Sequence, residues 1–249
     1  MKSTALDAAS NGDARQQAVV RKYAVSRLSP KLDELGWERK AGKASPVAIM
    51  RSDLIASLGR LGDPKVLAEA RRRYETDKMP AELRKVILAV VAYNADAATW
   101  DKMHAAAKAE KTPLVKDRLY TLLAAPKDDA LAKRALELAL TDEPGATNSA
   151  AMISRVGNGH PELAFEFATA HKEKVDTFVD GTSSSRYYPG LARNSLDLAT
   201  IPKIEAFAQK YIAATSRREA ESAVANIRYR NQVRKERLPA VDAWLKKNG

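Results

Sequence analysis

The sequence predicts an all-α protein built from stacked pairs of antiparallel helices, and three observations support this prediction. Gly and Pro are scarce, with 11 of each among 249 residues, so little in the chain opposes helix formation. Apolar residues recur at intervals of three and four, which is the spacing along one face of a helix. The sequence also lacks a convincing alternation of apolar and polar residues, which would have indicated a strand.

The first part of the chain, residues 1–45, is expected to hold irregular first helices. Two prolines then mark helix starts, at Ser45-Pro46 and Asp63-Pro64. In both cases a side chain that can cap a helix stands directly before proline, whose missing N–H costs nothing at the first helical position. The apolar series between them has helical spacing and consists of Met50, Leu54, Leu58 and Leu61.

Residues 46–140 contain the clearest repeats. Three segments, 54–63, 87–96 and 119–128, resemble one another, and each ends in an aspartate that can cap the next helix. These aspartates are 96 − 63 = 33 and 128 − 96 = 32 residues apart. A unit of this length holds two helices and cannot bury its apolar face alone, so consecutive units must stack. The expected fold is a HEAT- or armadillo-like superhelix of antiparallel helix pairs that forms a curved bowl.

Within these repeats, further helices are predicted around Leu83, Ile87 and Val90, from Thr112-Pro113 onward, and around Leu131 and Leu136. The spacing of the apolar residues and the Thr-Pro pair predict these helices.

Residues 141–249 are expected to continue the array as further helix pairs with a less regular period. Turns are predicted at 142–145, 157–161 and 181–185, where Gly, Pro and Ser gather. Ser216 and Glu219 have the spacing of a capping box that would open the next helix. None of the turns is long enough for a domain linker, so we interpret residues 1–249 as a single domain.

Composition excludes several classes of chemistry. The chain has no cysteine, which removes disulfides, thiolate nucleophiles and cysteine-ligated metals. The longest apolar run, Val86–Tyr93, is far shorter than the roughly 18 residues of a membrane-spanning helix. We therefore expect no contact with a membrane.

The sequence contains no recognisable catalytic motif and no predicted metal site. His104, His160 and His171 are 56 and 11 residues apart, so no two of them share a helix face as zinc ligands. The motifs H-E-x-x-H and G-x-S-x-G are absent. The acidic pairs Asp128/Asp129 and Asp142/Glu143 flank helix ends, where capping and the helix dipole explain them.

The net charge of +11 leaves one alternative open, a free-standing helical-repeat module that binds nucleic acid or a protein partner. Residues 217–247 hold nine Lys and Arg against four Asp and Glu, and Arg71–Arg73 form a second basic group. We interpret both groups as solvated helix faces, because cations are favourable near helix C-termini, and we do not expect nucleic acid as the partner. The three tryptophans stand beside periodic apolar positions and are predicted to anchor the core; they are Trp37, Trp100 and Trp244.

A succession of short motifs resembles the C-terminal domain of the gluzincin zinc aminopeptidases, the puromycin-sensitive, alanyl and endoplasmic-reticulum aminopeptidases. The resemblance extends from about Asp13 to Leu245. Its motifs are Leu35-Gly36-Trp37-Glu38, residues 58–64, residues 96–101, residues 135–140, Leu163-Ala164-Phe165-Glu166-Phe167 and the closing Trp244-Leu245.

This resemblance implies an accessory domain without catalytic activity of its own. In that family a separate N-terminal domain carries the zinc ligands and the catalytic residues, and the helical C-terminal domain encloses the substrate chamber and limits or guides peptide access. The expected partners are therefore that catalytic domain and a peptide substrate. Zinc is expected in the catalytic domain of the parent enzyme, and no cofactor is expected in this chain, which would be a fragment of a longer protein.

The resemblance also implies candidate peptide-binding residues. In animal relatives a basic residue stands in the turn that follows Ile-x-Arg and precedes a Leu-Ala-aromatic helix, and here Ile153-Ser154-Arg155 precedes Leu163-Ala164-Phe165. Arg155 is the candidate, since guanidinium can bind both oxygens of a carboxylate. The turn is one residue longer here, and Val156 is the other residue that could take the position.

Arg186 with Tyr187, which follow the serine-rich loop, are the second set of candidates, since the family begins a helix there that can face the chamber. The alternative is that these residues and Tyr188 only cap and pack that helix.

Overall fold

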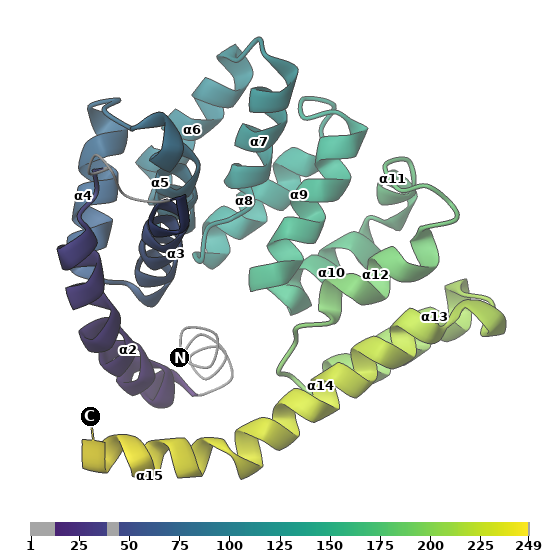
Figure 1. Cartoon of the computed structure of the whole chain (residues 1–249). Helices are drawn as coiled ribbons and strands as arrows, with labels where there is room; N and C mark the ends of the chain where they lie inside the picture. The colour runs from purple at the N-terminus through teal and green to yellow at the C-terminus, as the bar shows by residue number, and fades with distance from the viewer. Residues whose placement is uncertain (1–12, 39–44, 249) are drawn as a thin grey trace. The chain divides into compact units, whose positions relative to one another are not determined.

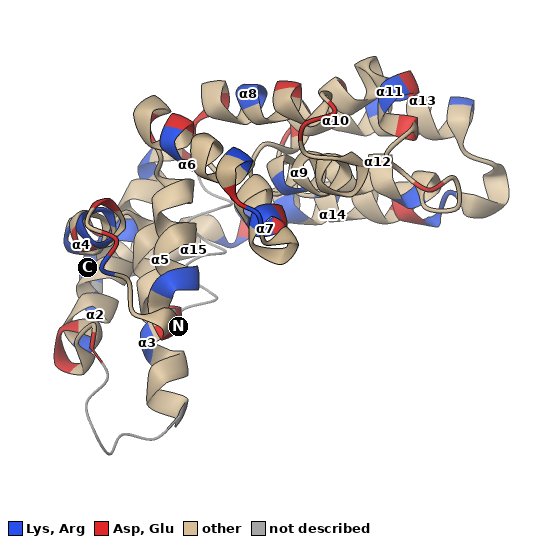
Figure 2. Ribbon diagram, turned by 90° about the horizontal axis from the view of Figure 1, so that it is seen from above, with Lys and Arg blue, Asp and Glu red and all other residues tan. Residues whose placement is uncertain are grey.

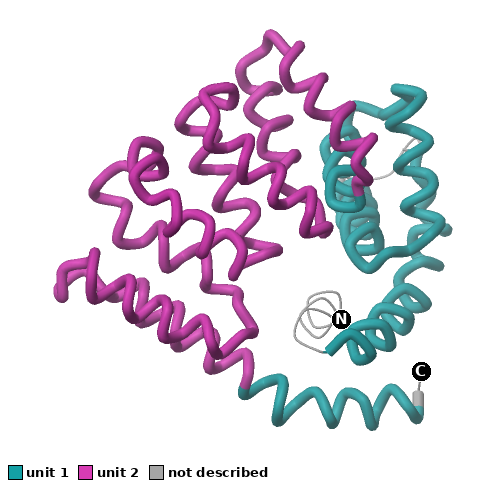
Figure 3. The backbone as a smooth tube through the Cα atoms, turned by 180° about the vertical axis from the view of Figure 1, so that it is seen from behind, with its two compact units in different colours: residues 1–94, 232–249 teal, residues 95–231 magenta. Residues whose placement is uncertain are grey.

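The computed structural model describes residues 13–38 and 45–248, and the described secondary structure is helical (Figure 1). The chain divides into two compact units (Figure 3). Unit 1 consists of residues 1–94 and 232–249, and unit 2 consists of residues 95–231. Among the described helices, none combines the length and the apolar character needed to cross a bilayer.

In its described residues, unit 1 contains four helices of the N-terminal part, the end of α14 (Arg218–Glu236) and one further helix of the C-terminal part. Apart from α14, they are α2 (Ala14–Leu35), α3 (Ser45–Leu61), α4 (Pro64–Glu75), α5 (Ala81–Tyr93) and α15 (Leu238–Asn248). Helix α3 packs against α2, α4 and α5, and α15 packs against α2. The main core joins α3 to α5 through Leu54, Ile55, Leu58, Ile87 and Val90. A second cluster, Val20, Ala24, Leu61 and Leu245, holds the C-terminal helix in place.

Unit 2 contains eight α-helices before α14, in described residues. They are α6 (Ala97–Ala109), α7 (Pro113–Leu123), α8 (Asp129–Ala139), α9 (Ala146–Gly159), α10 (Pro161–Ala170), α11 (Lys172–Asp176), α12 (Ser184–Ala192) and α13 (Thr200–Tyr211). The short 3₁₀ helix η1 (Ala214–Ser216) then leads into α14 (Arg218–Glu236), which runs from unit 2 into unit 1.

The helices of unit 2 stack in pairs, as the repeat predicts. Helix α6 packs on α7, and α8 packs on α9. Helix α9 also packs on both α7 and α12, and α10 packs on both α9 and α12. The stack buries Tyr120, Leu136, Met152, Ile153, Phe165, Tyr188 and Ile204 almost completely. The all-α stack of helix pairs is therefore confirmed, whereas the curved bowl and the single domain stay predictions.

The three aspartates of the repeat cap helices as predicted. The carboxylates of Asp63, Asp96 and Asp128 accept hydrogen bonds from the backbone N–H three residues later, at 3.0, 2.8 and 3.0 Å. These bonds begin α4, α6 and α8 and satisfy N–H groups that have no partner inside the helix. The recurrence at 33 and 32 residues is thus a recurrence of helix starts.

Beyond residue 141 the helix pairs continue, and an insertion explains why their period is harder to see. Helices α7 and α9 begin at 113 and 146, which are 33 residues apart, whereas α12 begins at 184, which is 38 residues after α9. The extra length lies in α11 and the segment between it and α12. The predicted turn at 142–145 is confirmed, with Gly145 at a positive φ of 80°.

Two cap predictions are wrong. Helix α7 does begin at Pro113, but the Thr112 side chain makes no capping hydrogen bond, and Glu110 instead accepts from the Thr112 N–H at 2.7 Å. Ser216 belongs to η1, where its N–H donates to the Ala213 carbonyl, and α14 begins at Arg218. A residue already in a helical turn cannot adopt the extended N-cap backbone, so the capping box does not form.

The prediction of a turn at 157–161 is also wrong in extent, because α9 continues to Gly159 and α10 begins at Pro161. Gly157 lies inside α9, and a Cβ at this position would lie 3.0 Å from the Leu191 carbonyl oxygen of α12. Glycine at this position allows α9 and α12 to approach each other closely, and it does not form a turn.

Two of the three tryptophans take the predicted place. Trp100 is buried, and Trp37 packs against the core of unit 1. Trp244 is 49% exposed and packs edge-on against Tyr23, with ring centroids 5.4 Å apart. Its neighbour Leu245 takes the core position instead, because consecutive residues of a helix point in different directions.

Candidate functional site

The predicted peptide-binding residues lie on two helices of unit 2 that pack together, α9 and α12. Arg155 is partly buried and lies within α9, four residues before its last residue, rather than in the following turn. Val156, the other residue considered for this position, is fully buried. An arginine side chain is long enough to reach away from its helix while its methylene stem packs.

Tyr187 is fixed against α9 by its hydroxyl, which donates a hydrogen bond of 2.8 Å to the Ala150 carbonyl oxygen. Burial raises the pKa of Tyr187 to about 12, even though a hydrogen bond with Ser154 acts in the opposite direction. Ser154 directly precedes Arg155, so the structure brings Tyr187 next to the stretch of α9 that carries the arginine.

Arg186 and Tyr188 have different surroundings. Arg186 is exposed in the first turns of α12. Tyr188 is fully buried, and its hydroxyl donates to the Asp176 carboxylate at 2.7 Å. Burial raises the pKa of Tyr188, and its hydrogen bond with Asp176 adds to this shift. Tyr188 therefore packs its helix.

Sequence reasoning missed a cluster of polar residues around Glu143. The Glu143 carboxylate lies 2.5 Å from Nε2 of His104 and 3.0 Å from Nζ of Lys108, and it accepts from the Tyr120 hydroxyl at 3.1 Å. Burial favours the neutral acid, but hydrogen bonds from His104, Lys108 and Tyr120 nevertheless hold the pKa of Glu143 below its usual value. Burial and the bond to Glu143 raise the pKa of Tyr120 to about 12.

The cluster around Glu143 joins helices to one another. Glu143 follows α8, His104 and Lys108 lie on α6, and Tyr120 lies on α7, so one carboxylate ties three successive helices. The interpretation of Glu143 as a helix-end residue, satisfied by capping and the dipole, was therefore incomplete. Its partner His104 is 39 residues away in sequence, which no local pattern reveals.

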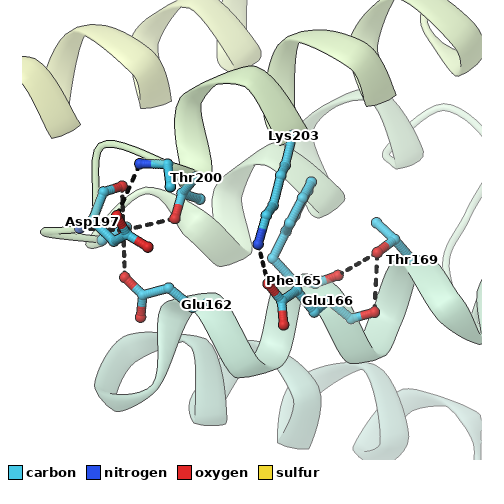
Figure 4. Close-up of polar contacts among 9 residues, drawn as sticks. Glu162, Phe165, Glu166, Thr169, Asp197, Thr200 and Lys203 are labelled. Atoms are coloured by element: carbon cyan, nitrogen blue, oxygen red, sulfur yellow. Dashed lines mark hydrogen bonds and ion pairs between the residues drawn. The ribbon is translucent and has the colours of Figure 1, made fainter.

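A second polar group joins α10 to α13 (Figure 4). The hydroxyl of the fully buried Ser195 donates to Glu162 and lies 3.2 Å from the Thr200 hydroxyl. One turn further along α10, Glu166 pairs with Lys203 of α13 at 2.5 Å. The figure shows the two carboxylates on the same side of α10 facing α13. Ser195 and Glu162 are 33 residues apart, which is the repeat length.

Among the described residues, no three His, Asp or Glu side chains gather in a way that could hold a metal ion. The histidines are separately engaged: His104 with Glu143, His160 with Asp129 and Pro126, and His171 by ring packing against Phe167. The contacts of His104 and His160 join different helices or turns, whereas the His171–Phe167 contact lies at the end of α10. None of the three offers a nucleophile with an adjacent base.

Comparisons with known proteins agree with the fold. Residues 3–229 match the family model described as the ERAP1-like C-terminal domain. Over 176 residues the chain is 26% identical to Aminopeptidase M1-A of Oryza sativa subsp. japonica. The aligned segment is 67% of this chain and 20% of the rice protein, so the chain spans about a fifth of the curated relative that it matches.

Proposed function

The chain belongs to the family of ERAP1-like C-terminal domains of M1 aminopeptidases, and we propose that it is the accessory domain of a zinc aminopeptidase. In this role it encloses the substrate chamber, limits or guides the entry of peptides, and leaves bond cleavage to a catalytic domain. The family match carries the proposal, because it covers residues 3–229 and hence almost every helix of the structure.

In this proposal the zinc ion is bound by the catalytic domain and not by this chain. There a zinc ion would polarise the scissile carbonyl and activate water. The described residues of this chain do not offer a matching set of ligands, so no step of the hydrolysis is assigned to them. The part proposed for this domain is to bind and position the peptide.

Arg155 is the proposed contact for the carboxylate at the C-terminus of the peptide. The guanidinium group suits this task because it donates two parallel hydrogen bonds to a carboxylate. Tyr187 and Arg186 are proposed to contribute from α12, which packs on α9. The hydroxyl of Tyr187 is held by the Ala150 carbonyl, so its proposed contribution is an aromatic wall beside Arg155.

An antibody against the chain provides the test of the accessory role. Aminopeptidase activity is measured with aminoacyl-anilides on the recombinant chain, with and without added zinc, and on the protein that the antibody precipitates from source cells. We expect no turnover by the recombinant chain and chelator-sensitive turnover by the precipitate. Hydrolysis by the recombinant chain, or a precipitate without aminopeptidase activity, would contradict the proposal.

The alternative is a basic helical-repeat module that binds nucleic acid, and the exposed Arg228 and Tyr229 on α14 are the features that favour it. Acidic and basic positions are nevertheless interspersed along the helices (Figure 2). Many basic side chains pair with acids of neighbouring elements, for example Lys174 with Asp142 and Lys203 with Glu166. The alternative predicts binding to labelled duplexes with a steep salt dependence, whereas the accessory role predicts none at low salt.

A further inference from the structure

One side of α9 is open to solvent and carries an arginine among small and polar side chains. The exposed residues Thr147, Ala151 and Asn158 follow one another at intervals of four and seven. Residues at these intervals lie on the same side of a helix. Arg155 is partly buried and follows Ala151 by four residues, so it lies on this side as well.

Helix α12 packs on α9 and adds a second open surface. Its exposed residues are Arg186 and Gly190, which are four residues apart. On the other side of the two helices, α8 packs on α9, and α10 packs on both (Figure 2). The exposed residues of α9 and α12 therefore point away from α8 and α10, and with Arg155 we call them the α9–α12 face.

Charge is distributed unequally between these two sides. Helices α9 and α12 together contain two basic residues and no acidic residue, which gives +2. Helices α8 and α10 together contain two basic and four acidic residues, which gives 2 − 4 = −2. Because like charges repel and opposite charges attract, the α9–α12 face favours an anionic ligand.

The acidic residues of neighbouring segments have hydrogen-bond partners of their own. Asp117 of α7 accepts from the side-chain amide of Asn148 at 2.8 Å. Asn148 lies 155 − 148 = 7 residues before Arg155, which is about 10 Å along the helix. Asp180, which precedes α12, accepts from the Thr182 N–H at 2.8 Å. Among the described side chains, none forms an ion pair with Arg186.

An acidic side chain of a peptide complements this face. Guanidinium binds a carboxylate through two parallel hydrogen bonds. Tyr187 joins its turn of α12 to the Ala150 carbonyl of α9 at 2.8 Å, and so holds the backbone of Arg186 close to α9. We propose that the α9–α12 face selects peptides with an acidic side chain near the C-terminus, and that Arg186 binds this side chain. The inference rests on the proposed function, because it takes Arg155 as the contact of the terminal carboxylate.

Binding of labelled peptides to the recombinant chain tests this selection. The peptides carry either Glu or Gln near the C-terminus and end in either a free carboxylate or an amide, and fluorescence anisotropy gives Kd. The Glu peptides should bind about three- to fivefold more tightly than the Gln peptides, and the difference should shrink as salt is added. Equal affinities of Glu and Gln peptides would overturn this inference alone, whereas absence of binding by every peptide would also contradict the proposed peptide contact.

Substitutions of Arg186 separate its role from that of Arg155. Arg186→Gln should abolish the preference for Glu and leave the preference for a free C-terminus, and Arg186→Lys should keep part of the preference for Glu because it keeps the charge. Lys133→Gln is the matched control, since Lys133 is exposed on α8, and it should change neither preference. If Arg186→Gln instead abolishes the preference for a free C-terminus, Arg186 binds the terminal carboxylate and the proposal is wrong.

A labelled DNA duplex provides the competing interpretation of the same charge. The duplex should not displace a bound Glu peptide at low salt. Displacement that is lost in Arg186→Gln would assign the face to nucleic acid and overturn the proposal.

Discussion

The side-chain amide of Asn94, at the end of α5, donates a hydrogen bond of 3.1 Å to the carbonyl oxygen of Gly59 in α3. Gly59 has no side chain at the point where the two helices meet, and a Cβ there would lie 2.5 Å from Cγ2 of Val90. The amide bond and the missing side chain together set the spacing between α3 and α5 in unit 1.

Gly59→Ala is therefore expected to lower the free energy of unfolding by about 1–3 kcal/mol. Val90 is β-branched and has few alternative rotamers, so the helices must move apart. Urea denaturation measures the loss. Gly190→Ala is the matched control, because nothing lies within 4 Å of a Cβ at Gly190 in α12, and it should be neutral or stabilising by up to about 1 kcal/mol. Equal effects of the two substitutions would refute this explanation.

Substitutions of the helix-capping residues are expected to lower the free energy of unfolding by different amounts. Asp128→Ala removes one cap bond and should cost about 1 kcal/mol. Asp63→Ala should cost more, because Asp63 is buried and also accepts from Ser29. Thr112→Ala should cost less than about 0.5 kcal/mol, since the Thr112 side chain does not cap α7. Denaturation curves of the three variants check the order, and a loss for Thr112→Ala as large as for Asp128→Ala would contradict it.

We expect the free energy of unfolding to depend on pH because of the carboxylate of Glu143. Its pKa is held below the usual value, so the ionised form stabilises the fold at neutral pH, and this contribution is lost as the pH falls through the pKa of the folded state. Glu143→Gln should lower the free energy of unfolding by about 1–3 kcal/mol at neutral pH. The difference from the wild type should shrink in acid.

Glu137→Gln on the exposed face of α8 is the matched control for this substitution and should change stability by less than about 0.5 kcal/mol. A loss in Glu143→Gln that is the same at every pH would show that the charge of Glu143 is not responsible.

The proposed role of Arg155 predicts a selective loss of affinity. In the native aminopeptidase, Arg155→Ala should raise KM about tenfold for peptides with a free C-terminal carboxylate, which corresponds to about 1.4 kcal/mol. Peptides with an amidated C-terminus should keep their KM, because they lack the charge that Arg155 would bind. Arg118→Ala, which removes an exposed arginine of α7, should affect neither peptide class. Equal changes for free and amidated peptides would exclude the carboxylate contact.

The sequence alone determined the helical class, the starts of α4 and α7, and the caps of α4, α6 and α8. These features depend on interactions across three or four residues, such as the bond from the Val66 N–H to Asp63, and such interactions are visible in a short stretch of sequence. Arg155 and Tyr187 could be named only through the family resemblance, and their proposed contact with peptide is still a prediction.

Tertiary structure decided which side chains meet between the repeats. His104 with Glu143, His160 with Asp129, and Ser195 with Glu162 are 39, 31 and 33 residues apart. One residue more or less in a repeat turns every later side chain by about 100° around its helix, so an approximate period cannot fix these partners. Packing also placed Gly157 inside a helix, where a Cβ would lie 3.0 Å from the Leu191 carbonyl oxygen of α12, because the closest approach of two helices outweighs the local preference of a single residue.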